Sequence, residues 1–382
     1  ILSIEDCIDA VDVETICILV GMMLLVAVIK NSGIFEYIAI KAAKIAKGRP
    51  WPIMVIFILI TAVCSGMLDN VTTVLLVGPM TLAITNILKV DPVPYIITQI
   101  MASNIGGTAT LIGDPPNIMI GSAAKLSFVD FILNTGVATV FVIIVGLICM
   151  YFIYGRKLFV TDESIAKVMQ LDENKAIKDR KLMHESVIVI ILVALCFIFH
   201  DQLGVQSCTV AIAAACIMLL IGGQEPEEII ADVEWPTILF FIGLFIVVGG
   251  MKKVGVITML ANGLISITHG NMVVTMMVIL WVSAIVSSFL DNIPFVATLI
   301  PMILTMQSEG MDVAPIWWAL SLGACLGGNG TLIGASANVV GVATAAKSGH
   351  IIKWGRYCKA MVPATVIVMI IATIMICVRY VH

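Results

Sequence analysis

Two short stretches place acidic and amide side chains between long apolar segments. Carboxylate, amide and hydroxyl oxygens are ligands for small cations. An aspartate at bilayer depth costs roughly 2.5–3.5 kcal/mol on insertion scales, whereas a helix cap contributes only about 1 kcal/mol. We therefore interpret both stretches as binding elements, although each aspartate could also serve only as a cap. The candidate residues are Asp69, Asn70, Thr72 and Thr73 in the first stretch, and Asp291 and Asn292 in the second.

A glycine-rich break follows each of these stretches, within a further apolar segment. The breaks read NIGGTATLIGDPPN at 104–117 and GGNGTLIGASAN at 327–338. Half-helices that end at a break offer N–H groups to anions and carbonyl groups to cations, and glycine lets the backbone approach a ligand closely. Tight helix packing is the alternative explanation of the glycines. We assign the breaks to a binding site with the candidate residues Asn104, Gly106, Gly107, Thr108, Asp114, Asn117, Gly327, Gly328, Asn329, Thr331, Ser336 and Asn338.

The two halves of the chain repeat each other. Residues 65–80 recur as 287–302 with 7 identities in 16, and residues 106–113 recur as 327–334 with 6 in 8. Asp114 is the exception, because alanine stands at the matching position of the second break. If the halves meet at one cavity, Asp69, Asp114 and Asp291 converge there and cannot all stay ionised and unpaired. We expect Asp114 to couple transport to a cation; the alternative is that it only accepts hydrogen bonds from N–H groups freed by the prolines after it.

Composition predicts a multi-pass membrane protein. Of 382 residues, 60% are hydrophobic and 12% charged, and the mean hydropathy is +1.10. This is more apolar surface than one soluble core can bury. The net charge of −4 gives no indication of a nucleic-acid partner. Neither a nucleophile with a base nor a metal-ligand spacing is evident, so we expect no enzyme activity, no cofactor and no resident metal, with Na⁺ or H⁺ as a coupling ion.

The apolar segments predict an all-α fold. Segments 51–67 and 71–88 flank Asp69 and predict a re-entrant helical hairpin, although two full crossings are also possible; 272–306 predicts a second hairpin. Residues 95–123 and 314–346 predict two broken membrane helices, and 34–47 and 255–268 predict helices in the membrane interface. The remaining expected spans are 14–30, 128–154, 186–200, 207–222, 236–250 and 359–378.

These elements predict two repeats of opposite orientation, at 1–154 and 186–382, joined by a solvated linker at 155–185. Five crossings separate Asp69 from Asp291, and an odd number inverts the second repeat. A cytoplasmic linker places 17 basic residues inside and 4 outside, a strong positive-inside bias. Two spans precede Asp232-Val233-Glu234 but not its match, Asp12-Val13-Glu14. We therefore expect the natural N-terminus to carry about two more helices.

Several motifs resemble the P-protein and arsenite-permease branch of the ion transporter superfamily, with its citrate-transporter-like domain. The motifs are LDNVTT, NIGGTATLIGDPPN, VDVETICILVGMM and FEYIAIKAAKIAKGRPW, and they are most similar to P-protein-like permeases. The resemblance implies inverted repeats with re-entrant hairpins and broken helices, a homodimer, and elevator-type alternating access. Members move arsenite, exchange sodium for protons, or carry chloride-like anions or di- and tricarboxylates. The tips here read Asp-Asn-Val and Asp-Asn-Ile, where the dicarboxylate branch has Ser-Asn-Thr.

We therefore expect a secondary active transporter in the lipid bilayer of the plasma membrane, with a cytoplasmic linker. The expected substrate is a small inorganic ion or oxyanion, as in arsenite and anion permeases. A Na⁺/H⁺ antiporter is the alternative, followed by a di- or tricarboxylate transporter and a channel.

Overall fold

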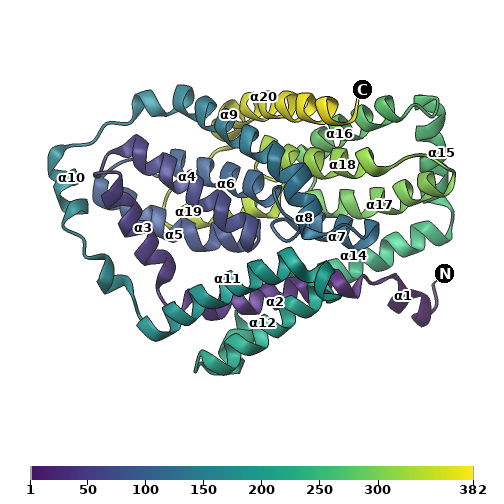
Figure 1. Cartoon of the computed structure of the whole chain (residues 1–382). Coiled ribbons are helices and arrows are strands. Elements are labelled where there is room, and N and C mark those ends of the chain that lie inside the picture. The colour runs from purple at the N-terminus through teal and green to yellow at the C-terminus, as the bar shows by residue number, and fades with distance from the viewer. Residues whose placement is uncertain (1, 382) are drawn as a thin grey trace.

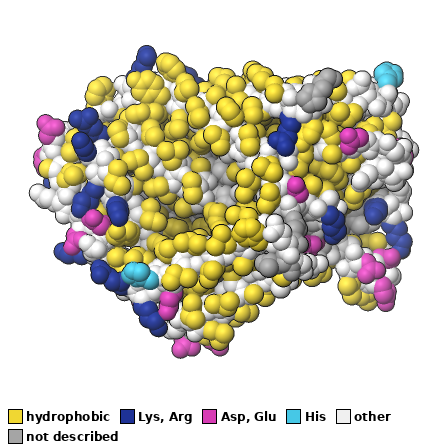
Figure 2. Space-filling view, viewed as in Figure 1, with side chains coloured by type: hydrophobic (Ala, Val, Ile, Leu, Met, Phe, Trp, Pro, Cys, Tyr) yellow, Lys and Arg dark blue, Asp and Glu magenta, His cyan; other side chains and the backbone are white. Residues whose placement is uncertain are grey.

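The computed structural model of the chain describes residues 2–381, apart from the side chains at 200, 201 and 203. Within this range every regular element is a helix, and eight helices are long and apolar enough to cross a membrane. Apolar side chains cover the middle of the face shown in Figure 2, and basic side chains gather at its left end. The expected all-α polytopic membrane fold is confirmed.

Two central helices form the core of the molecule. These are α6 (Val93–Gly107), in which every residue is buried, and α18 (Ala314–Gly327), which is buried from Pro315 onward. A helix that is apolar on all sides belongs in the interior of a bundle. Each central helix packs against the first helix of a pair, α4 (Pro50–Met67) against α6 and α16 (Met272–Phe289) against α18.

The contact between each pair and its central helix is the same in both halves. The Ser65 hydroxyl donates to the Ser103 carbonyl at 2.6 Å, and the Ser287 hydroxyl donates to the Ala324 carbonyl at 2.6 Å. Both serines are fully buried. The recurrence of this bond matches the repeat seen in the sequence.

In each pair, an aspartate joins the first helix to the second, as expected, and we call this connection the tip of the pair. The second helices are α5 (Asn70–Leu88) and α17 (Asn292–Ser308), with Asp69 and Asp291 as their N-caps. The central helices stop at glycine and resume after the break as α7 (Pro115–Ala124) and α19 (Ser336–Lys347), with the short turn η4 (Gly328–Gly330) in the second break.

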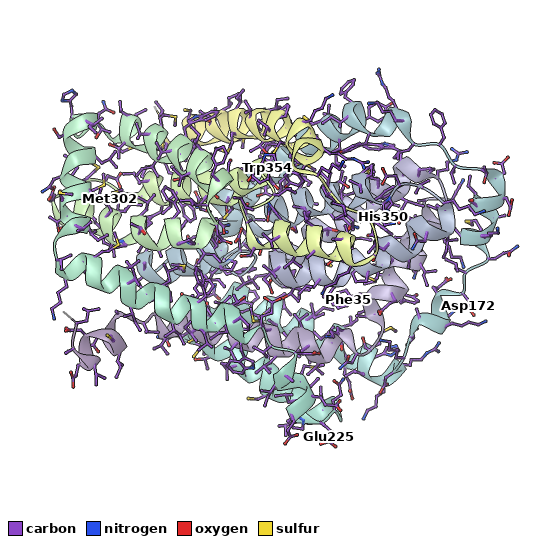
Figure 3. All side chains as sticks on the ribbon, turned by 180° about the vertical axis from the view of Figure 1, so that it is seen from behind. Phe35, Asp172, Glu225, Met302, His350 and Trp354 are labelled. Atoms are coloured by element: carbon purple, nitrogen blue, oxygen red, sulfur yellow. The ribbon has the colours of Figure 1, made fainter. Side chains whose placement is uncertain are left out.

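The two groups of helices occupy opposite ends of the molecule. In Figure 1, α4, α5 and α6 lie at the left and α16, α17 and α18 at the right. Seen from behind in Figure 3, Asp172 lies at one end and Met302 of α17 at the other. This arrangement agrees with inverted repeats and re-entrant hairpins, which stay predictions, as do the repeat boundaries.

The remaining helices surround this core. Helix α2 runs alongside α12, and α9 alongside α20. The Cβ of any residue replacing Gly21 in α2 would lie 2.7 Å from the Ala211 carbonyl carbon in α12, so glycine permits this close packing. The helices are α1 (Ile4–Ala10), α2 (Val13–Lys30), α3 (Ile34–Ile45), α8 (Phe128–Phe131), η1 (Ile132–Gly136), α9 (Val137–Ile153), α11 (Arg180–Leu203), α12 (Ser207–Ile221), α13 (Pro226–Ala231), α14 (Trp235–Lys253), α15 (Val256–Thr268) and α20 (Trp354–Tyr380).

The linker at 155–185 is more ordered than a solvated connector. It contains η2 (Gly155–Lys157), α10 (Asp162–Met169), η3 (Glu173–Ala176) and the start of α11. Val168 is fully buried, and the Lys44 amine of α3 donates to Glu173 at 2.6 Å and to the Leu171 carbonyl at 3.2 Å. Most of the linker is nonetheless exposed or partly exposed. Val168 packs against α3 and α5, and the cytoplasmic linker stays a prediction.

Candidate functional site

The aspartate at each tip caps the helix that follows it. An Asp69 carboxylate oxygen accepts from the Thr72 N–H at 2.8 Å, and an Asp291 oxygen accepts from the Ile293 N–H at 3.1 Å. Asp69 is 4% exposed. A serine would cap a helix equally well, so the cap alone does not account for a buried acid.

At the first break, the Asn117 side chain forms hydrogen bonds with backbone carbonyls of the unwound segment. Its amide donates to the carbonyls of Gly107 and Thr108 at 3.3 Å each and of Thr110 at 2.9 Å. Its own oxygen accepts from the Ser321 hydroxyl of α18 at 2.6 Å. Asn117 is fully buried. One side chain therefore satisfies the unwound carbonyls and joins the break to the opposite central helix.

Asn338 has the same role at the second break. Its amide donates to the carbonyls of Gly328 and Thr331 at 2.7 Å each, and its oxygen accepts from Asn104 at 2.8 Å. Asn104 also donates to the Asn329 side chain at 3.0 Å and accepts from Asn70 at 3.3 Å. These amides connect the tip of the first pair to both breaks.

The two breaks share the spacing of their glycines, and this spacing reflects close backbone packing. A Cβ added at Gly113 would lie 2.6 Å from the Gly107 carbonyl oxygen, and one at Gly334 would lie 2.5 Å from that of Gly328. Gly106 and Gly327 face the backbones of Ala62 in α4 and Ala284 in α16. None of these glycines has a positive φ. Close packing therefore accounts for these glycines, and their place in a binding site stays a prediction.

A small cavity lies where the tips and breaks meet. Its volume is about 20 Å³, which is enough for about one water-sized species. Its lining includes three carboxylates and no basic side chain. The lining residues are Leu19, Met23, Asp69, Asn70, Val71, Asp114, Pro115, Glu234, Thr237, Asn292, Ile293 and Ser336.

Both halves of the chain contribute polar side chains to the lining of this cavity. The Asn292 amide donates to the two oxygens of Asp114 at 3.3 Å each, so the second tip contacts the first break. Asn70 is 2% exposed, and its side-chain oxygen has no hydrogen-bond donor. A buried carbonyl oxygen without a donor is an available ligand for a cation.

Asp291 is not among the residues that line this cavity. Its second oxygen accepts from the Ser336 hydroxyl at 2.5 Å, and Ser336 lines the cavity. Asp114 still interacts electrostatically with both Asp69 and Asp291. The convergence of the three aspartates on one cavity stays a prediction, and the third acid in the lining itself is Glu234.

That acid, Glu234, was missed by the sequence reasoning. It immediately precedes α14, accepts from the Thr237 hydroxyl at 3.2 Å and interacts electrostatically with Asp69. The available signal was its place in the Asp-Val-Glu motif that recurs before an apolar span in both halves.

The expected threonines do not line the cavity, and neither does Asn338. The Thr108 hydroxyl donates to the Asn104 carbonyl at 2.7 Å, and the Thr331 hydroxyl donates to the Ser288 carbonyl. Thr72 contributes its backbone N–H, and the Thr73 hydroxyl is buried without a partner. The Thr108 and Thr331 hydroxyls therefore bind backbone around the cavity instead of lining it.

Sequence comparisons agree with this architecture. The family described as Citrate transporter matches residues 1–323. An uncharacterized transporter of Mycobacterium tuberculosis is 42% identical over 374 residues, covering 97% of this chain and 87% of the relative. The P proteins of Sus scrofa and Homo sapiens are 32% and 31% identical over 91% of this chain and 51% of their own length, so the chain spans about half of a P protein. The resemblance to P proteins is confirmed, and the chain belongs to the citrate transporter family of multi-pass membrane transporters.

Proposed function

We propose that this protein is a secondary active transporter that binds Na⁺ or H⁺ in the cavity among Asp69, Asp114 and Glu234. The movement of this cation drives, or is exchanged for, a small inorganic ion. The observation that carries the proposal is a cavity of about 20 Å³ with three acids and no base in its lining.

The chemistry of the lining favours a cation. Carboxylates that share a poorly solvated space repel one another, and they lose this repulsion when a cation binds or a proton is taken up. The free oxygen of Asn70 adds a neutral ligand. Occupancy of the cavity therefore changes the charge of the region where both halves meet, which is a physical basis for coupling.

A Na⁺/H⁺ antiporter is the second candidate. It is favoured because the cavity holds about one small species and all its polar ligands are acidic or neutral. The two cations would then occupy the same carboxylates in turn. Neutral arsenous acid agrees with the charge of this lining, but it is larger than one water-sized species and would need a wider conformation.

A tricarboxylate is the cargo suggested by the family's name, but the cavity does not favour it. A citrate ion is several times larger than about 20 Å³ and brings negative charge toward three acids. Binding of citrate would require a wider conformation with cations bound first.

The position of the cavity suggests how access alternates. One side consists of α5, α7, α17 and α19, and the other of Leu19 and Met23 in α2 with Glu234 and Thr237 at α14. Movement of the tips and breaks as one body against α2 and α14 would open the cavity, in agreement with an elevator mechanism. The homodimer stays a prediction from the family resemblance.

Flux measurements on the purified chain in proteoliposomes test the proposal. Arsenite, chloride, citrate and sodium are offered in turn under imposed pH and sodium gradients. We expect saturable flux of an inorganic ion that depends on one of the two gradients. Citrate flux that is independent of both gradients would contradict the proposal, and flux that does not saturate would indicate a channel.

A further inference from the structure

A second, larger cavity lies away from the tips and breaks. Its volume is about 720 Å³, and it is lined by the loop between α5 and α6, the end of α9 and the start of α20. It shares no lining residue with the central cavity. Nothing in the transport proposal uses it.

The lining of this cavity is basic. Lys89, Lys157, Arg356 and Lys359 contribute to it, with Asp91 as the one acid in the wall. Asp91 already forms an ion pair with Arg356. Within residues 2–381, Lys157 and Lys359 form no ion pair, and both are exposed. The cavity therefore retains positive charge for an anion.

The same cavity adjoins apolar surface. Helices α9 and α20 pack side by side, and both expose large apolar side chains along their length. Phe152, 59% exposed, and Phe159, 84% exposed, stand in the wall. The Arg156 guanidinium lies 5.1 Å from the centre of the Phe152 ring. Aromatic and basic residues at the end of an apolar helix are typical of the membrane–water boundary.

We propose that this cavity binds the headgroup of an anionic phospholipid, with Lys157 and Lys359 contacting its phosphate and the acyl chains lying along α9 and α20. Basic pockets between membrane helices bind such headgroups. A soluble anion would use the lysines but gain nothing from the exposed phenylalanines and the apolar faces of the two helices. The combination of both surfaces at one cavity favours a lipid.

Native mass spectrometry of the purified, delipidated full chain in neutral detergent tests this proposal with phosphatidylglycerol as the probe. We expect saturable binding that weakens about thirtyfold in the double variant Lys157→Gln, Lys359→Gln, because each of the two lysines near an anionic headgroup contributes about 1 kcal/mol. The control variant Lys175→Gln, Lys347→Gln removes the same charge from exposed positions outside the cavity. It should bind like the wild type.

Three results would overturn the proposal. The first is equal binding of phosphatidylglycerol by the wild type and the Lys157/Lys359 double variant, with unchanged thermal stability of both. The second is equal binding of phosphatidylcholine, which lacks the net charge. The third is displacement of phosphatidylglycerol by soluble glycerol phosphate at the same concentration, which would identify a site for free phosphate esters. These binding measurements do not depend on transport, so their outcome is independent of the proposed function.

Discussion

Replacing Asn117 by alanine tests the amide that binds the first break. The variant loses the 2.9 Å bond to the Thr110 carbonyl, two longer bonds to Gly107 and Thr108, and the acceptor of the Ser321 hydroxyl. A buried polar group left without a partner costs about 1–3 kcal/mol. The Thr110 carbonyl and the Ser321 hydroxyl are the two groups left without this hydrogen-bond partner. We therefore expect the free energy of unfolding to fall by about 3 kcal/mol.

The assay is thermal unfolding of the purified protein in detergent. An unfolding entropy of about 2.1 cal/mol/K per residue gives about 0.8 kcal/mol/K for 382 residues, so a loss of about 3 kcal/mol lowers Tm by about 4 °C. Asn134→Ala is the matched control. Asn134 donates to the Asp130 carbonyl at 2.7 Å and accepts from the Tyr380 hydroxyl at 2.5 Å, but it is only half-buried.

Water can replace the bonds of Asn134, so its removal should lower Tm by about 1 °C or less. Equal shifts for Asn117→Ala and Asn134→Ala would refute the reasoning. They would mean that the carbonyls of the first break find other donors and do not depend on the amide.

Three further predictions follow from the fold and the site. A cysteine at Lys167 should react with an impermeant thiol reagent only from the cytoplasm and one at Lys252 only from outside; labelling of both from one side would contradict the inverted repeats. Glu234→Gln should weaken binding of the coupling cation about tenfold or more, whereas Glu14→Gln, its repeat counterpart outside the cavity, should not; equal effects would remove Glu234 from the site. The Lys44 amine holds the pKa of Glu173 below the usual 4.5. The linker contact is therefore fully formed above pH 4.5 and is lost as pH falls through the lowered pKa. Limited proteolysis at 155–180 should increase as pH is lowered below 4.5, and resistance equal to that at neutral pH would show that the ion pair does not hold the linker.

Local chemistry made the interruptions in the helices predictable. Proline and aspartate favour helix starts, and glycine weakens a helix where no side chain packs. The sequence therefore predicted arms at 51–67 and 71–88, and the structure has α4 at Pro50–Met67 and α5 at Asn70–Leu88. It also predicted that the segment 95–123 is two half-helices, which end at Gly107 and resume at Pro115.

The lining of the cavity was less predictable, because it depends on which way each side chain points. Thr108 and Thr331 stand in the expected segments, yet their hydroxyls bind nearby carbonyls, a common alternative for threonine in and near helices. Glu234 reaches the cavity only because α14 packs beside α2 and α17. Such tertiary packing is not encoded in the local pattern around a single acid.

The central claim is that the cavity carboxylates couple transport to a cation, and Asp114 tests it most directly. Asp114→Asn keeps an oxygen that can accept from the Asn292 amide but removes the charge. The decisive measurement is the flux of the transported ion in proteoliposomes as a function of the imposed proton and sodium gradients. We predict that Asp114→Asn folds and binds substrate but loses the gradient dependence of the wild type. Unchanged gradient dependence in a folded, substrate-binding variant would contradict the claim and assign Asp114 a structural role.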